Sequence, residues 1–123
     1  MEYEELTEET IGCAYKVYNR MGFGFLESVY EKCLLIELRN AGHNADSQKP
    51  ITVFYDGEIV GDFVADIIVA NTIILELKSV RRIAKAHEIQ LVNYLVATGK
   101  PVGPLINFGE YKVEIKRKLR QLP

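Results

Sequence analysis

The sequence predicts an α+β domain in which helices pack against a mixed β-sheet. Apolar residues recur at helical spacing in the first third of the chain and alternate at strand spacing in the middle. A third helical segment and two more strand-like segments follow, so the expected order is αα-ββββ-α-ββ. At 123 residues, 48% of them hydrophobic, the chain matches a single domain over residues 1–123 with a packed core.

Three segments carry the helical pattern. The first covers residues 7–21, with Thr7 as a suitable N-cap and acidic residues directly after it. A Gly-Phe-Gly break separates it from the second helix, which covers residues 26–41 and stops at Gly42. A third helix is expected over residues 83–98, because glycine and proline follow it.

The strands are predicted from alternation and from turn residues between them. Asp56-Gly57 is typical of a hairpin turn between two strands. Asn71 separates two further segments rich in Val and Ile, and Gly109 separates the last two strands. The expected strands cover residues 51–55, 58–60, 62–70, 72–79, 104–108 and 111–116, and a basic tail follows the last one.

The formal charge of -2 is unevenly distributed along the chain. The first ten residues carry five glutamates and no base. By contrast, residues 78–88 and 110–123 each have a net charge of +3. These two basic segments can be ordinary solvated surface, or they can help to hold a phosphate backbone.

Membrane insertion and secretion are not expected. No apolar run approaches the roughly 20 residues needed to span a bilayer, and the N-terminus is acidic where a signal peptide would be basic and then apolar. Cys13 and Cys33 lack a CxxC spacing and a histidine cluster. We therefore expect reduced, buried thiols in a cytoplasmic protein.

A charged pair stands out in an otherwise apolar strand. Strand alternation over residues 73–78 places Glu76 and Lys78 on one face, and Asp66 lies in the preceding apolar strand. A two-residue turn would put Asp66 and Glu76 on opposite faces. A three-residue loop, Ala70 to Thr72, places them directly opposite each other, and Asn71 suits the positive φ that such a loop needs.

Opposed carboxylates about 5 Å apart are unfavourable unless a proton or a cation lies between them. A divalent cation meets this need, and two carboxylates with water form a hard-oxygen site suited to Mg²⁺ or Mn²⁺. The alternative is a Glu76–Lys78 surface pair on an edge strand, because many antiparallel sheets have one solvated face.

The third helix presents a polar stripe of His87, Gln90 and Tyr94. The stripe adjoins the carboxylates if it faces the sheet edge, and otherwise it is a half-exposed helix face. Glu27, in the first turn of the second helix, is a further candidate, although a glutamate there also suits the helix dipole.

These residues resemble a known family. The segment from Gly24 through Glu27 to Tyr30 looks like the GxxExxY signature of a small bacterial and archaeal family within the PD-(D/E)XK nuclease superfamily. Asp66, then Glu76-Leu-Lys78, then Gln90 with Tyr94, resemble the superfamily's Asp, ExK and QxxxY elements in order, over residues 7–115. Ala65 stands where the superfamily has proline, which removes no ligand.

The resemblance implies a restriction-endonuclease-like core and metal-dependent hydrolysis of phosphodiester bonds. Asp66, Glu76 and a main-chain carbonyl near Leu77 would bind Mg²⁺, with Mn²⁺ as a substitute, and Lys78 would orient the attacking water. Tyr94 is expected to pack rather than react. The remaining implied roles are metal binding through water by Glu27, substrate phosphate or Lys78 positioning by Gln90, and nucleic-acid backbone contacts by Arg81, Arg82 and Lys85.

Two other functions fit the same residues. The fold can serve as a catalytically silent module that binds nucleic acid or a protein partner, and such binding would survive removal of metal. The chain can also be a structural domain whose acidic N-terminus docks on a basic partner. If it cuts both strands of a duplex with one site per chain, a symmetric homodimer is favoured.

Overall fold

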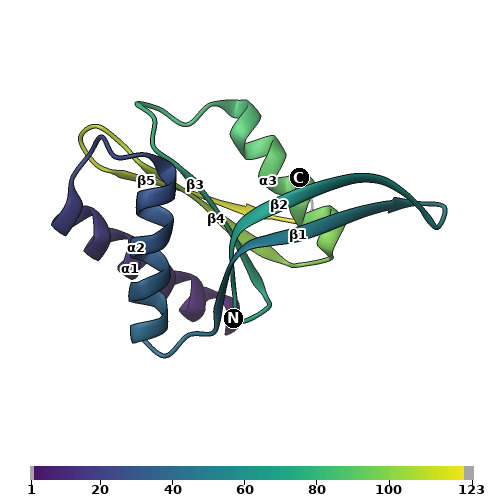
Figure 1. Ribbon diagram of the computed structural model, residues 1–123, viewed down its shortest axis with the longest axis horizontal. Helices are drawn as coiled ribbons and strands as arrows, with labels where there is room; N and C mark the ends of the chain where they lie inside the picture. The colour runs from purple at the N-terminus through teal and green to yellow at the C-terminus, as the bar shows by residue number, and fades with distance from the viewer. Residues whose placement is uncertain (1, 121–123) are drawn as a thin grey trace.

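The structure is a computed structural model that describes residues 2–120, so Met1 and residues 121–123 of the expected domain and basic segment lie outside it. Within the described range the chain forms three helices and five strands (Figure 1). In chain order they are α1 (Glu2–Met21), α2 (Glu27–Asn40), β1 (Ala45–Tyr55), β2 (Glu58–Val69), β3 (Ile73–Lys78), α3 (Lys85–Thr98), β4 (Val102–Phe108) and β5 (Val113–Leu119).

The five strands form one mixed sheet in the order β1-β2-β3-β4-β5. Only the pair β3 and β4, which α3 connects, is parallel; the other pairs are antiparallel. Alternate β3 residues face opposite cores: Leu75 packs with Tyr30 and other residues of α1 and α2, and Ile74 packs with Leu91 of α3. The predicted α+β class is therefore confirmed, with helices on both faces of the sheet.

The expected start of the first helix was wrong. α1 begins at Glu2, and Thr7 lies buried inside it, where its Oγ1 donates a hydrogen bond to the Tyr3 carbonyl oxygen at 2.6 Å. Tyr3 and Leu6 pack against the core and extend the apolar face toward the N-terminus. Packing of this first turn, rather than a cap at Thr7, sets the beginning of the helix.

The expected helix stops are confirmed. Gly42 follows α2 with φ +90°, and Gly99 ends α3 with φ +71°, a conformation that favours glycine. α3 begins at Lys85, two residues later than expected, after residues 79–84 have crossed from the end of β3. Both cysteines are free, as expected, but they are half-buried rather than fully buried.

The expected division of residues 58–70 into two strands was wrong. β2 runs unbroken from Glu58 to Val69, so three strands rather than four follow the helical pair. Gly61 stays within the strand, and a bulge between Val53 and Phe54 absorbs the mismatch in register. The Asp56-Gly57 turn is confirmed by positive φ angles at both residues.

The basic segment after the expected last strand also belongs to the sheet. β5 starts at Val113 and continues to Leu119, so Arg117 and Lys118 lie on an edge strand rather than in a tail. Within the described part of the chain, no helix is long and apolar enough to cross a membrane.

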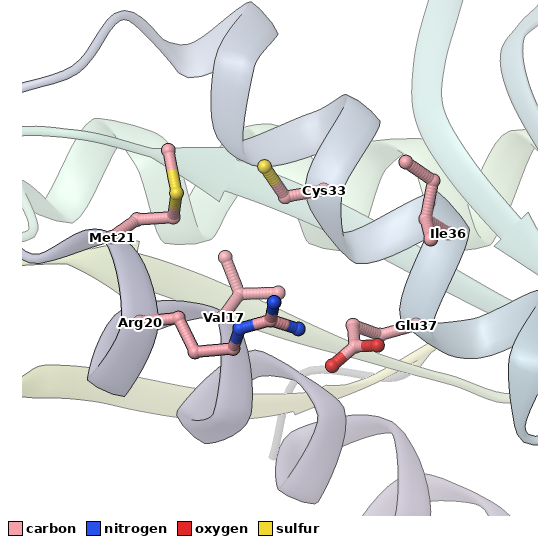
Figure 2. Close-up of a pocket in the computed structure, with 6 residues that line it drawn as sticks. All are labelled: Val17, Arg20, Met21, Cys33, Ile36 and Glu37. Atoms are coloured by element: carbon pink, nitrogen blue, oxygen red, sulfur yellow. The ribbon is translucent and has the colours of Figure 1, made fainter.

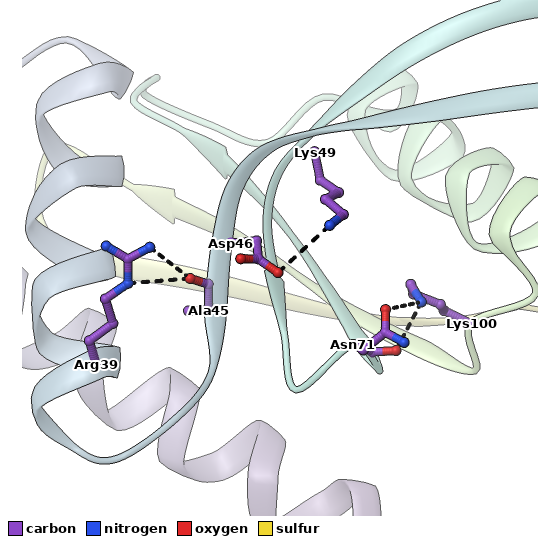
Figure 3. A network of polar contacts seen from close by, with 6 residues as sticks. All are labelled: Arg39, Ala45, Asp46, Lys49, Asn71 and Lys100. Carbon is purple, nitrogen blue, oxygen red and sulfur yellow. Dashed lines mark hydrogen bonds and ion pairs between the residues drawn. The ribbon is translucent and has the colours of Figure 1, made fainter.

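The loop between β2 and β3 has the expected three residues. Val69 pairs with Ile73, and both Ala70 and Asn71 have positive φ. Lys100 holds the loop, because its Nζ donates to the main-chain and side-chain oxygens of Asn71 at 2.9 and 3.2 Å (Figure 3). In the same view, Arg39 of α2 donates to the carbonyl oxygen at the start of β1.

β2 pairs with β3 only near this loop, over Ile67 to Val69. Beyond Ile67, β2 leaves β3 and continues with β1 as a two-stranded arm that extends away from the body (Figure 1). The place where β2 and β3 separate lies at Asp66 on one strand and Glu76 on the other.

Candidate active site

Asp66 and Glu76 are the first residues beyond the last β2–β3 pair, Ile67 with Leu75. Asp66 Oδ2 accepts a hydrogen bond from the main-chain nitrogen of Leu77 at 2.8 Å. Glu76 Oε1 accepts one from the main-chain nitrogen of Asp66 at 3.4 Å. Each carboxylate therefore bonds to the opposite strand where main-chain pairing has stopped, and the two lie together.

Burial disfavours the charged forms of both carboxylates. The Glu76 side chain lies against the α3 side of the sheet at 6% exposure. Burial, and then the charge of Asp66, raises the pKa of Glu76 to about 8. Burial also raises the pKa of Asp66, although the Leu77 N–H and the Lys78 charge oppose this shift. The pair thus favours an added proton or cation.

Lys78 and Tyr94 complete the surroundings of this pair. Lys78 is half-exposed, and its charge lowers the pKa of both carboxylates and therefore lies close to each. Tyr94 of α3 is buried, and its pKa is raised by burial and then by Glu76 and Asp66. Its ring packs against Phe63 with centroids 5.1 Å apart, which agrees with the expected packing role.

Two residues near Asp66 were missed in the sequence. Gln48 lies opposite Asp66 on β1 with φ +52°, and its hydrogen bond lowers the pKa of that carboxyl. Its Nε2 also donates to Glu31 Oε1 at 2.7 Å. Burial is the main cause of a raised pKa at Glu31, and the Asp66 charge adds to it. Gln48 therefore connects the helix α2 to the carboxylate pair.

Glu27, Gln90 and His87 are not brought into contact with the carboxylates. Glu27 and Gln90 are exposed and form no hydrogen bond or ion pair within residues 2–120. The charge of Glu27 acts on Glu31, one helical turn further along. His87 Nδ1 accepts a hydrogen bond from the main-chain nitrogen of Ala84 at 3.1 Å, so this histidine caps the start of α3.

The Gly24-to-Tyr30 segment supports the end of β3 from the other side. Gly24 has φ +112°, and the Tyr30 hydroxyl donates to the Gly22 carbonyl oxygen. The Tyr30 ring stacks on Phe108 with centroids 4.2 Å apart. Ser79, next to Lys78, donates to the carbonyl oxygen of Phe25 at 2.8 Å. The loop before α2 is thus fastened to the residue that follows Lys78.

Asn107 of β4 pairs with Lys78 of β3, and its side chain fixes the chain that follows Lys78. This fully buried amide accepts from the Val80 nitrogen at 2.9 Å and donates to the Val80 carbonyl oxygen at 2.8 Å. It also donates to Glu114 Oε1 of β5 at 2.9 Å. The chain is thus fixed at Val80. The basic residues expected to contact nucleic acid come after this point and are all exposed: Arg81, Arg82 and Lys85.

The donor set fits a hard divalent cation. Two carboxylates contribute oxygens, and the Leu77 carbonyl points to the same side of β3 as its N–H, which meets Asp66. No group of three His, Cys, Asp or Glu side chains in residues 2–120 is arranged to hold a metal. A bound Mg²⁺ would take its remaining ligands from water, as is common for this ion.

A separate cavity of about 350 Å³ lies between α1 and α2 (Figure 2). These helices cover the face of the sheet opposite Glu76, so the cavity is not part of the carboxylate site. Its lining is mainly apolar, with one basic and one acidic side chain: Val17, Arg20, Met21, Cys33, Ile36 and Glu37.

Comparison with known proteins agrees with this geometry. A solved structure titled "Crystal structure of SSO0001" is 20% identical in sequence, with a TM-score of 0.60 over 78% of this chain and 50% of that chain. This chain thus spans about half of that one, and the likeness concerns the fold alone. A search of curated proteins finds no match. The family model described as the PD-(D/E)XK nuclease superfamily matches residues 4–118, and the chain belongs to that superfamily.

Proposed function

We propose that this chain is a metal-dependent nuclease that hydrolyses phosphodiester bonds of nucleic acid. The observation that carries the proposal is the Asp66–Glu76 pair, buried together at the separation of β2 and β3 with Lys78 beside it. Structural ion pairs lower the pKa of a carboxylate, whereas here both are raised. A site that binds a divalent cation explains why such a pair is kept.

Each residue of the carboxylate site has its own role in this proposal. Asp66, Glu76 and the Leu77 carbonyl would hold Mg²⁺, which when bound polarises the scissile phosphate and lowers the pKa of a coordinated water. Lys78 carries an ammonium group, which orients the attacking water and stabilises the charge that develops on the phosphate oxygens. The Leu77 N–H fixes the rotamer of Asp66, and the Tyr94 ring closes the site on the α3 side.

The residues around the carboxylate pair would contact the substrate or the water bound to the metal. Gln90 faces outward on α3, where it can donate to a substrate phosphate. Glu27 is assigned to the metal through water, and Glu31, which lies nearer to Asp66, shares that assignment. Arg81, Arg82 and Lys85 hold the phosphate backbone, which carries no base specificity.

We further propose that the chain is a member of the GxxExxY family. Gly24 and Tyr30 support this, because the glycine has a positive φ and the tyrosine hydroxyl bonds to the loop that contains it. In this proposal the signature glycine and tyrosine shape the loop beside β3, and the signature glutamate, Glu27, would bind the metal through water.

Digestion of labelled single-stranded and double-stranded DNA and RNA with Mg²⁺ or Mn²⁺ tests the nuclease proposal. We expect metal-dependent cleavage that Asp66→Asn, Glu76→Gln or Lys78→Met reduces by at least about 100-fold, since each removes a group that acts on the transition state. Asp62→Asn, an exposed position four residues earlier on β2, is the matched control and should retain full activity. Cleavage that survives Asp66→Asn would show that another site, or a contaminant, is responsible.

A further inference from the structure

A second cavity, of about 400 Å³, opens beyond the end of β3. It lies between the β3–α3 connection, the start of α3 and the β4–β5 hairpin. None of its lining residues is a candidate ligand of the metal. The lining is strongly charged and consists of Arg81, Arg82, Ile83, Glu88, Gly109, Glu110, Tyr111, Lys112, Glu114 and Lys116.

The acidic residues of this cavity already have partners. Each of its three carboxylates bonds to a side chain of the same protein, and in two of the three pairs a cation offsets the negative charge. The pairs are Glu110 with Arg81 at 3.4 Å, Glu88 with Lys118 at 3.0 Å and Glu114 with Asn107 at 2.9 Å.

Three of its cations, by contrast, have no such contact. Arg82, Lys112 and Lys116 form no ion pair or side-chain hydrogen bond within residues 2–120. They approach the cavity from two sides, Arg82 from the β3–α3 connection and the two lysines from the β4–β5 hairpin and β5. A cavity with paired acids and unpaired bases is suited to a phosphate group.

Tyr111 adds an aromatic surface to these cations. Its side chain is 89% exposed at the turn between β4 and β5, and its ring has no aromatic neighbour among the described residues. An exposed aromatic ring beside free cations is the arrangement on which unpaired bases stack while the backbone is held. A base within a duplex does not offer its face to such a ring, because it is stacked between its neighbours.

The cavity is within reach of the carboxylate site. Lys78, Asn107 and Glu114 are register neighbours across β3, β4 and β5. Two strand spacings, about 10 Å, therefore separate Lys78 from the cavity wall. Even at the ~3.4 Å rise of a stacked duplex, a nucleic-acid strand covers this distance within about three nucleotides, and an unpaired strand needs fewer.

We propose that this cavity binds an unpaired nucleotide of the substrate strand, with its base stacked on Tyr111 and its phosphate held by Arg82, Lys112 and Lys116. The preferred substrate is then single-stranded nucleic acid or the single-stranded end of a duplex. This inference rests on the proposed function, because it extends that site along the same strand.

Fluorescence anisotropy with a labelled single-stranded oligonucleotide and a duplex of the same sequence tests the proposal, with EDTA present so that binding is separated from cleavage. We expect Tyr111→Ala to weaken binding of the single strand by about 5- to 100-fold and binding of the duplex by less than about twofold. Tyr111→Phe should keep wild-type affinity. Tyr55→Ala, which changes another exposed tyrosine, at the tip of the arm, is the control and should change neither.

Three results would overturn the proposal: no binding of the single strand at low salt, no effect of Tyr111→Ala, or an equal effect on both oligonucleotides. This binding test and the cleavage test can fail separately. Tyr111-dependent binding without metal-dependent cleavage would refute catalysis and leave the nucleotide cavity in place. Metal-dependent cleavage that does not change in Tyr111→Ala would support catalysis and refute the nucleotide cavity.

Discussion

The carboxylate of Asp66 accepts a hydrogen bond from the main-chain N–H of Leu77, 2.8 Å away, at the point where β2 and β3 stop pairing. The side chain takes the place of a strand partner, so the N–H stays satisfied while the strands separate. Asp66 thus has a structural role as an acceptor and a proposed chemical role as a charge. Different substitutions separate the two roles.

Asp66→Asn should leave the free energy of unfolding unchanged or higher, because the amide oxygen can still accept from Leu77 and the repulsion with Glu76 is gone. Asp66→Ala should lower it by about 1–3 kcal/mol, because the N–H of Leu77 loses its partner. Urea unfolding without metal measures both. An Asn variant as unstable as the Ala variant would show that the charge itself holds the fold.

Stability of the metal-free protein should fall as pH rises. The pKa of Glu76 is about 8 in the folded protein and near 4.5 when unfolded, so the folded state binds the extra proton between these values. The stabilising contribution is complete below about pH 4.5 and is lost as pH rises through 8. Each pKa unit corresponds to about 1.4 kcal/mol, and the raised pKa of Asp66 acts in the same direction.

Urea unfolding in EDTA between pH 5 and 9 measures this slope, and Glu76→Gln should reduce it sharply because the amide does not titrate. Glu58→Gln, an exposed position on β2, is the control and should keep the wild-type slope. A flat profile for the wild type would contradict the buried pair. Saturating Mn²⁺ should also flatten the profile, because the cation takes the place of the proton.

Gly103→Ala should destabilise the fold by about 1–3 kcal/mol. A Cβ at this position of β4 would lie 2.4 Å from the Ile74 carbonyl oxygen and 3.1 Å from a Leu91 methyl group, so α3 could not pack as closely on the sheet. In Gly61→Ala, the nearest contact is an ordinary 3.7 Å to the Phe63 side chain, and little change is expected. Thermal unfolding compares the two, and equal effects would refute the close approach.

Tyr30→Phe should cost about 1 kcal/mol, the contribution of a typical hydrogen bond. The hydroxyl bonds to the loop carbonyl of Gly22, whereas the stacking on Phe108 is kept in the variant. Tyr15→Phe in α1 is the control, since Tyr15 is 45% exposed. If Tyr30→Phe leaves the urea midpoint unchanged, the hydroxyl does not hold the loop.

Local chemistry explains why much of the site was predictable. The glycines that end α2 and α3 and the loop at Asn71 depend on backbone conformations that few residues adopt. Once the loop length was fixed, strand alternation placed Asp66 opposite Glu76. This relation needs only residues 66–78, all within one hairpin.

The missed features depend on contacts between distant segments. Thr7 reads as a cap until the packing of Tyr3 on the core is known, and residues 58–69 read as two strands because Gly61 interrupts the pattern. Glu31 lies one turn from Glu27 on the same helix face, so spacing alone could have suggested it. Gln48 gave no such signal, because its place opposite Asp66 follows from the register of β1.

The central claim, that Asp66 and Glu76 form a metal site, is tested most directly by isothermal titration of Mg²⁺ and Mn²⁺ into the wild type, Asp66→Asn and Asp62→Asn near pH 8. The account predicts saturable binding to the wild type and to Asp62→Asn, loss of binding in Asp66→Asn, and weaker binding at pH 6, where protons compete. Absence of saturable binding to the wild type, or equal binding in all three proteins, would contradict it.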